Sequence, residues 1–318
     1  MDVAGLVKGA SEGKGLGNKF LDTLRQADMF IQIVDISATT TLEGQEGKGD
    51  PIADVEMLEG ELNKWYEQIF AKVWEKLSRT IQSTKTDFAK SVAKQFSGLR
   101  VKEVDVNKVL TILKLDPTQP TSWSKQDLKD FTRVLRYSTK PMLIAANKAD
   151  KPNSQENLAK LKQAFPDMKI IPCSADAELS LRQAANAGLI EYIQGESTFK
   201  IIENKISDKQ KEALESIQKN VLDKFGSAGI QDVLDKSVFD LLKYIAIFPA
   251  GSKLADSKGN VLPDCFLLPN KTTALDFAYS LHTDIGDKFI KAIDVRTKQP
   301  VGKDYPLKHR DGIEIMTS

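Results

Sequence analysis

The loop Asn147-Lys148-Ala149-Asp150 follows the apolar run PMLIAA and has residue types suited to reading a purine base. The Asp150 carboxylate offers two acceptors in the fork that matches N1–H and the exocyclic amine of guanine, and adenine presents no such pair of donors. The Lys148 stem can lie along the base plane, and the Asn147 side chain can tie neighbouring loops together. An ordinary polar loop after a strand is the alternative interpretation.

Two shorter motifs occur in an informative order around this loop. Asp2-Val3-Ala4-Gly5 has the form Asp-x-x-Gly, in which the Asp can hold Mg²⁺ through water and the Gly lets a backbone N–H approach a γ-phosphate. Ser174-Ala175 follows the run KIIPC, and a turn there can offer a backbone N–H to guanine O6. Each motif is weak by itself, but the three in this order form the ordered signature of a GTPase G domain.

The elements that must position these motifs are short strands alternating with helices. Phe30–Ile36, Pro141–Ala146 and Lys169–Cys173 are apolar runs typical of buried strands. Helical periods are expected at three segments: Gly17–Gln26, Asp54–Leu77 and Leu158–Phe165. This alternation predicts a parallel, doubly wound α/β sheet, at whose carboxyl edge ligands bind.

Two further regions depart from that alternation. Residues 69–136 are Lys-rich and helical in period, with a Pro-containing break at Asp116–Pro120, which predicts a helical insertion. From Ile245 onward, short strands separated by turns surround one helix, Thr273–Leu281, with Thr273 as its cap. The last 70 or so residues are therefore expected to form a small α+β domain.

Composition excludes several classes of function. The net charge of +1 gives no global attraction to nucleic acid or membrane, and no apolar run is long enough to span a bilayer. The two cysteines, Cys173 and Cys265, lie in apolar runs and are expected to be reduced core residues of a cytoplasmic protein. His282 and His309 are expected to have structural roles, and a zinc site is not expected.

The whole chain resembles the Obg-like GTPases, in particular the archaeal-type YchF branch. The stretch DVAGLVKGASEGKGLGNKFLDTLRQAD is similar to their switch II region. VLPDCFLLPNKTTALDFAYSLHTDIGDKFIKAID and VGKDYPLKHRDGIEI resemble the TGS domain, a ubiquitin-like β-grasp module. The resemblance implies that Asp2 is the Mg²⁺-linked acid and Gly5 the γ-phosphate sensor. It also implies that Asn147, Lys148 and Asp150 read guanine, with support from Ser174 and Ala175.

The resemblance predicts four regions and a cytoplasmic protein that contacts ribosomes or rRNA. Residues 1–68 and 137–204 form an incomplete Ras-like G domain, residues 69–136 the insertion, residues 205–244 a helical connector and residues 245–318 the TGS domain. Eight basic residues of the insertion could touch RNA phosphates, or could be the ordinary solvated side of its helices. They are Lys72, Lys76, Arg79, Lys85, Lys90, Lys94, Arg100 and Lys102.

The phosphate-binding loop of such enzymes is not found in the sequence. A Walker A loop needs Gly-x-x-x-x-Gly-Lys followed by Ser or Thr, but Gly13-Lys14 is followed by Gly15, and Lys8 stands where the first Gly should be. We expect a truncated gene model rather than a natural fragment, and an exposed apolar surface on Phe30–Ile36. By itself the chain is expected to bind GTP or GDP weakly or not at all, to need the intact loop for Mg²⁺, and not to catalyse hydrolysis. The alternative function is a non-catalytic ribosome- or RNA-binding module that uses the insertion and the TGS domain.

Overall fold

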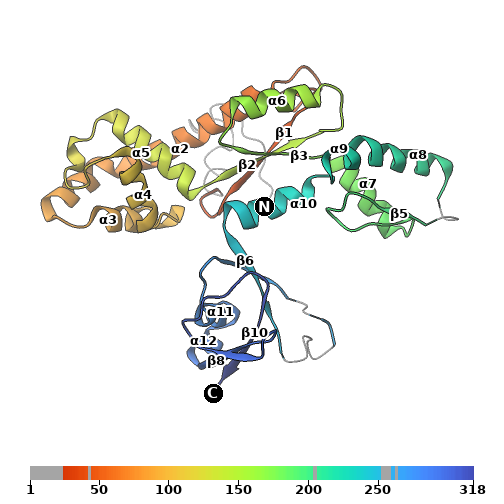
Figure 1. The fold of residues 1–318 in the computed structure, drawn as a ribbon. Coiled ribbons are helices and arrows are strands. Elements are labelled where there is room, and N and C mark those ends of the chain that lie inside the picture. The colour runs from red at the N-terminus through yellow and green to blue at the C-terminus, as the bar shows by residue number, and fades with distance from the viewer. Residues whose placement is uncertain (1–23, 42–43, 203–205, 252–258, 262–263) are drawn as a thin grey trace. The chain divides into compact units, whose positions relative to one another are not determined.

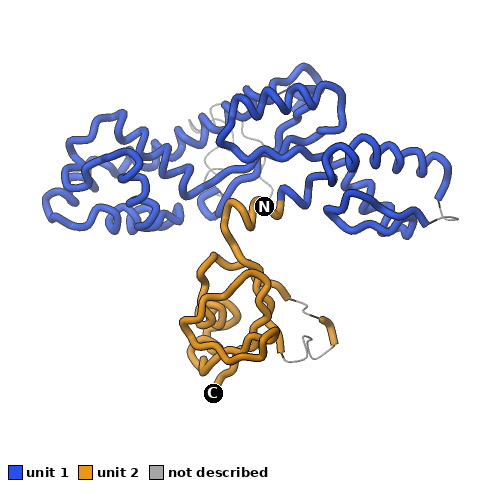
Figure 2. Tube along the Cα trace, in the orientation of Figure 1, with its two compact units in different colours: residues 1–233 blue, residues 234–318 orange. Residues whose placement is uncertain are grey.

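The computed structural model describes residues 24–318 apart from 42–43, 203–205, 252–258 and 262–263. The chain divides into two compact units, residues 1–233 and 234–318, which are coloured separately in Figure 2. None of the helices in the described residues is both long and apolar enough to cross a membrane.

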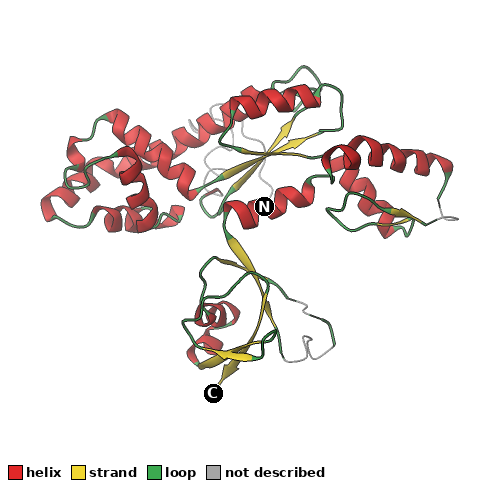
Figure 3. Cartoon of the chain, in the orientation of Figure 1, coloured by secondary structure: helices red, strands yellow, loops and turns green. Residues whose placement is uncertain are grey.

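Helices and strands follow one another in two patterns, a helix-rich first unit and a strand-rich second unit (Figures 1 and 3). The elements of the first unit are β1 (Phe30–Asp35), α2 (Pro51–Thr84), α3 (Phe88–Gln95), η2 (Ser97–Leu99), α4 (Glu103–Leu113), η3 (Pro120–Ser122), α5 (Lys125–Thr139), β2 (Met142–Asn147), α6 (Ser154–Ala164), β3 (Lys169–Pro172), α7 (Ala175–Asn186), β4 (Ile190–Glu191), β5 (Lys200–Ile201), α8 (Asp208–Ile217), η4 (Gln218–Leu222) and α9 (Asp223–Phe225). Helix α10 (Ile230–Asp235) spans the division between the units. The second unit continues with η5 (Lys236–Leu241), β6 (Tyr244–Pro249), β7 (Phe266–Pro269), α11 (Ala274–Leu281), α12 (Thr283–Asp287), β8 (Phe289–Asp294), β9 (Gln299–Val301) and β10 (Asp311–Thr317).

The three predicted strands form one parallel sheet in the order β1-β2-β3. The apolar residues of β2, the central strand, match the composition of a strand that is buried on both faces. The chain crosses from β1 to β2 through α2 to α5, and from β2 to β3 through α6. The predicted α/β sheet is therefore confirmed for the described strands, and all three carboxyl ends lie at one edge.

The two faces of this sheet differ at β1. One face carries Val34 and Ile144, which are fully buried against Val55 of α2 and Leu161 of α6. On β1 the alternating residues Ile31 and Ile33 are exposed, with 72% of Ile33 accessible. An apolar surface on this strand, as the sequence predicts, is thus present at these side chains.

Helix α2 links the sheet to the insertion without a break. Asp50 caps it by accepting hydrogen bonds from the amides of Ile52 and Ala53, and Pro51 occupies its first turn. It then runs for 34 residues, longer than the predicted Asp54–Leu77, so the predicted boundary at 68/69 falls inside a single helix. The predicted break at Asp116–Pro120 lies between α4 and α5, as expected, and its last residue, Pro120, begins η3.

The insertion has its own aromatic core, built from α2 to α5. Phe70 stacks on Phe96 with ring centroids 3.7 Å apart, and Trp74 lies 5.1 Å from Trp123. Leu24 is buried in the same cluster. This core also includes Met142 of β2, with Phe30 of β1 packed against it, so the insertion is joined to the sheet through shared apolar contacts.

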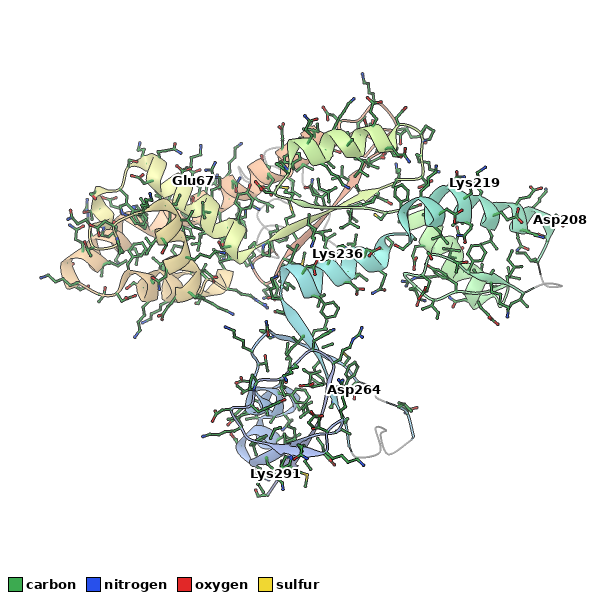
Figure 4. All side chains as sticks on the ribbon, viewed as in Figure 1. Glu67, Asp208, Lys219, Lys236, Asp264 and Lys291 are labelled. Carbon is green, nitrogen blue, oxygen red and sulfur yellow. The ribbon has the colours of Figure 1, made fainter. Side chains whose placement is uncertain are left out.

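The segment predicted as a connector is divided between the units, and its part up to residue 233 belongs to the first unit. Leu214 of α8 and Leu222 of η4 are buried in one cluster with Leu181 of α7 and Ile190 of β4. Polar residues such as Asp208 and Lys219 face outward on the same helices (Figure 4). The connector thus extends a hydrophobic cluster next to the β3 end of the sheet. The short β4–β5 pair within this cluster is not predicted by the sequence.

The second unit is a five-stranded mixed sheet, ordered β7-β6-β10-β8-β9, with α11 against it. Phe277 and Ala278 of α11 are fully buried, and Thr273 caps the helix by accepting from the Asp276 amide at 3.2 Å. The predicted strands and helix are confirmed here. Strand β9 and helix α12 are additions to the prediction.

The two cysteines differ in burial, and the two histidines accept hydrogen bonds from backbone amides. Cys173 is buried, but Cys265 is exposed, so the prediction that both are core residues is wrong for Cys265. It lies directly before β7, where alternate side chains face away from the core. Both histidines have the structural roles expected: Nδ1 of His309 accepts from the Ala246 amide, and Nδ1 of His282 accepts from the Asp284 amide.

Candidate functional site

Two of the predicted polar loops meet at the carboxyl edge of the parallel sheet. Asp35 and Asn147, the last residues of β1 and β2, are register partners. The Ala149 amide donates to the Cys173 carbonyl at 3.0 Å, which joins the loop after β2 to the end of β3. The parallel pairing of neighbouring strands therefore brings Asn147–Asp150 next to Ser174–Ala175, although 23 or more residues separate them in the chain.

Asn147 links these two loops directly. Its side-chain Oδ1 accepts a hydrogen bond from the backbone amide of Ala175 at 3.0 Å. This is the tie between neighbouring loops that the sequence predicts for Asn147. The same bond occupies the amide that the sequence offers to guanine O6, so a purine must share that amide with Asn147 or displace its side chain.

Ser174 serves the local architecture of the second loop. Its side chain is buried and caps α7 by accepting from the Ala177 amide, while its own amide donates to the Ala228 carbonyl at 2.9 Å. Next to Ala228, Gly229 has φ +82° and approaches the end of β3 so closely that a Cβ would lie 2.2 Å from the Pro172 carbonyl oxygen. The Ser174–Ala175 loop is thus held in place by its contacts with residues 228–229.

Lys148 adopts an uncommon backbone conformation and a well-defined side-chain position. Its φ of +62° lies in the left-handed region, which non-glycine residues rarely occupy. Its ammonium Nζ donates to Oδ2 of Asp35 at 2.7 Å and to Oγ1 of Thr40 at 2.8 Å. The side chain remains 39% exposed, so the lysine is anchored at its tip and still partly accessible.

Asp35 is the centre of a polar network that the sequence analysis did not identify. Its carboxylate accepts from the hydroxyls of Ser37, Thr39 and Thr40, from the Ser37 amide and from Lys148. Burial alone raises the pKa of Asp35, but the hydrogen bonds from Lys148, Ser37 and Thr40, together with the Lys148 charge, outweigh burial and hold the pKa well below its usual range. Asp35 is therefore a carboxylate with most of its acceptor sites used. The available signal was an acid at the carboxyl end of the FIQIV run.

A cavity of about 440 Å³ lies beside Lys148. Its volume is within the range of small-ligand pockets, ~300–1,000 Å³. The loop after β1 forms most of its wall, and Lys148 contributes from the loop after β2. The lining residues are Ala38, Thr39, Thr40, Glu46, Gly47, Lys48 and Lys148.

Asp150, the predicted base reader, lies at the other end of the same loop. Its side chain is largely buried, with 18% exposed, and its Oδ2 is 3.4 Å from Nζ of Lys151. A carboxylate in this position retains acceptor capacity for a pair of N–H donors.

The two predicted phosphate-side residues, Asp2 and Gly5, lie outside the described residues. Within the described residues, no group of three or more His, Cys, Asp or Glu side chains could hold a metal ion. The predicted Mg²⁺ site therefore stays a prediction.

The fold and these loops define a class: an α/β protein that presents an Asn-Lys-x-Asp loop and a Ser-Ala loop side by side at the carboxyl edge of a parallel sheet. Residues 145–251 match the family model described as the Obg-like GTPase YGR210-like, G4 motif-containing domain, and residues 246–317 match that of the TGS domain.

Relatives support the same assignment over the full chain. An uncharacterized GTP-binding protein of Methanocaldococcus jannaschii is 44% identical, covering 100% of this chain and 80% of that protein. The ribosome-binding ATPase YchF of Bacillus subtilis is 27% identical, covering 92% of this chain and 69% of that protein. The crystal structure of a GTP-binding protein from Pyrococcus horikoshii is similar with a TM-score of 0.74 and 40% identity, covering 94% of this chain and 81% of that chain. The chain belongs to the Obg-like GTPase family.

Proposed function

We propose that this chain recognises guanine nucleotides through Asn147, Lys148 and Asp150, with Ser174 and Ala175, as part of a GTP-dependent switch that acts on ribosomes. The observation that carries the proposal is the junction of the two loops by the Asn147–Ala175 hydrogen bond at the sheet edge. The names of the relatives support both parts: two are GTP-binding proteins and one is a ribosome-binding ATPase. Two free cysteines fit a cytoplasmic location.

Phosphate binding and hydrolysis need groups beyond these loops. Most of the affinity of such enzymes for nucleotide comes from backbone amides and a lysine around the β-phosphate, together with Mg²⁺. The 318 residues contain no Gly-x-x-x-x-Gly-Lys-Ser/Thr sequence. We therefore propose that these residues alone bind GTP or GDP weakly and turn over none, and that Asp2, Gly5 and Mg²⁺ act only together with a phosphate-binding loop.

Base specificity tests the proposal. Asp150→Asn replaces an acceptor by a donor opposite the exocyclic amine of guanine, so it should weaken the binding of guanosine. It should favour the binding of xanthosine, which carries an oxygen in place of that amine. The affinities of both nucleosides can be measured by saturation-transfer NMR at millimolar concentration. Asp167→Asn is a matched control because Asp167 is exposed and precedes β3, at the opposite end of the strand. An unchanged guanine preference in Asp150→Asn contradicts the proposal.

A ribosome- or RNA-binding module is the second candidate function. All eight basic residues identified in the insertion are exposed, and α3 carries Lys90 and Lys94 on its surface. Some of the other basic residues are neutralised, since Arg79 pairs with Glu75 and Arg100 with Asp28. If α3 touches phosphates, Lys90→Gln with Lys94→Gln should weaken ribosome co-sedimentation and lower its salt slope by about one per lost contact. Unchanged co-sedimentation would show that these lysines belong to the ordinary solvated side of the helix and do not bind RNA.

A further inference from the structure

We propose that Asp35 is a positioning residue for Lys148. Together with Thr40, it fixes the ammonium group, which orients the methylene stem to pack along the plane of the purine. The inference rests on the proposed function and adds to it a residue outside the loops that read the base. It is carried by the anchoring contacts, the burial of Asp35 and the cavity beside the lysine.

The anchor is a three-membered arrangement of charge and hydroxyl. Nζ of Lys148 lies 2.7 Å from Oδ2 of Asp35 and 2.8 Å from Oγ1 of Thr40. The Thr40 hydroxyl donates its own proton to the same Asp35 oxygen at 2.5 Å. Each of the three groups therefore contacts the other two, which restrains the lysine tip more tightly than a single ion pair could.

The acid is itself held rigidly by the loop that follows β1. The side chain of Asp35 is 12% exposed, and its other oxygen accepts from the amide and hydroxyl of Ser37 at 3.0 and 2.6 Å. The loop is closed by hydrogen bonds from the Gly47 amide to the Thr39 carbonyl and from the Gly49 amide to the Ala38 carbonyl, each 3.0 Å. Asp35 is thus a fixed point from which a flexible side chain can be oriented.

A lysine gains from such an anchor because its four-carbon stem can adopt many rotamers. Ordering a rotamer-rich side chain during binding lowers affinity, and a side chain ordered beforehand avoids that loss. The Lys148 side chain is 39% exposed and lines the cavity formed mainly by the loop after β1, so part of the side chain is accessible to a ligand. The expected contribution of the anchor to nucleoside affinity is about two- to tenfold.

A purely structural role for the ion pair makes a different prediction. In that case, removing Asp35 would loosen the loop after β1 but leave nucleoside affinity unchanged once the protein is folded. The two roles are separated by measuring the mobility of the Lys148 ammonium and the affinity for guanosine in the same variants.

The test compares Asp35→Asn and Thr40→Val, which keep the side-chain shapes, with the control Asp116→Asn. Asp116 is a suitable control because its carboxylate also accepts from a threonine hydroxyl and amide, those of Thr118, in an exposed turn of the insertion. Lysine ¹⁵Nζ NMR of the 318-residue chain reports the anchoring, with Lys148→Arg identifying the signal. Saturation-transfer NMR with guanosine reports the affinity.

We expect a slowly exchanging Lys148 ammonium signal in the wild-type chain and in Asp116→Asn. The signal should broaden or vanish in Asp35→Asn and Thr40→Val, with about two- to tenfold weaker guanosine binding and no change in the preference for guanosine over xanthosine. If Asp35→Asn does not fold, Thr40→Val alone decides the outcome.

The results distinguish the inference from the function on which it rests. An anchored signal that persists in both variants, or a lost signal with unchanged affinity, overturns the positioning role while Asp150→Asn still alters base preference. A wild-type chain that binds no guanosine at millimolar concentration overturns the proposed function, and the positioning role with it.

Discussion

The side-chain oxygen of Asn147 accepts the backbone amide of Ala175 at 3.0 Å, and this contact fastens the loop after β2 to the loop after β3. Both loops carry predicted base-reading residues. Their mutual position therefore depends on one hydrogen bond between residues that lie on different strands.

Asn147→Ala should expose the consequence of that contact. The Ala175 amide loses its acceptor, and because the bond is partly exposed the free energy of unfolding should fall by only ~0.5–1.5 kcal/mol. Amide hydrogen exchange measured by NMR should speed up at Ala175 and stay unchanged at Ala149, whose bond to the Cys173 carbonyl is independent of the side chain. Equal exchange at Ala175 in wild type and variant would show that the contact is not kept in solution.

Gly229 offers a test of the close approach behind the Ser174–Ala175 loop. In Gly229→Ala the new Cβ would lie 2.2 Å from the Pro172 carbonyl oxygen, in addition to the strain of φ +82°. Gly226→Ala is a matched control because Gly226 has the same φ of +82° with nothing within 4 Å of the added Cβ. Backbone strain should lower the stability of the control by ~1–2 kcal/mol. Gly229→Ala should lower the free energy of unfolding, measured with urea, by more than Gly226→Ala does. Equal losses of stability in the two variants would argue against the tight contact.

A buried ion pair joins α2 to α5 at the root of the insertion. Arg136 is fully buried and its guanidinium makes two hydrogen bonds to Glu59, which also accepts from the Tyr137 hydroxyl. Glu59→Ala leaves the Arg136 charge buried without its partner and should destabilise the first unit by ~3–5 kcal/mol. Tryptophan fluorescence during urea unfolding reports this unit, because all three tryptophans lie in it.

An exposed pair in the same helix supplies the control for that experiment. Glu75 and Arg79 of α2 are 77% and 73% exposed, so Glu75→Ala should change stability by less than ~1 kcal/mol. Losses of the same size in Glu59→Ala and Glu75→Ala would contradict a special role for the buried pair.

The depressed pKa of Asp35 predicts a dependence of stability on acid. Because the folded pKa lies below the unfolded value of ~3.9, the ionised carboxylate stabilises the fold above that value, and the contribution is lost as pH falls through the folded pKa. Asp35→Asn should therefore be less stable than wild type at neutral pH, and the difference should shrink below pH ~4. Urea unfolding at a series of pH values measures this, and parallel curves for the two proteins would refute it.

Local patterns in the sequence were enough to place the elements around the site. Short β-branched runs identified β1, β2 and β3, and the order of polar motifs after two of these strands identified the loops Asn147–Asp150 and Ser174–Ala175. These features depend on residues close together in the chain, whose burial and turn preferences act locally. The length of α2 was underestimated at both ends, because the helix begins at Pro51, directly after its cap Asp50, and continues beyond Leu77 to Thr84.

What the sequence alone determined is that the loops Asn147–Asp150 and Ser174–Ala175 follow strands of the sheet and that a TGS domain follows. Only the tertiary structure decided how those residues are paired. Asp35 and Lys148 are separated by 113 residues, and their contact exists because parallel pairing of β1 with β2 brings the two strand ends together. The same holds for Gly229. A side chain at this position would collide with the Pro172 carbonyl oxygen at the end of β3. Such contacts have no periodic signal in the chain, since they result from packing between elements rather than from the preferences of one element.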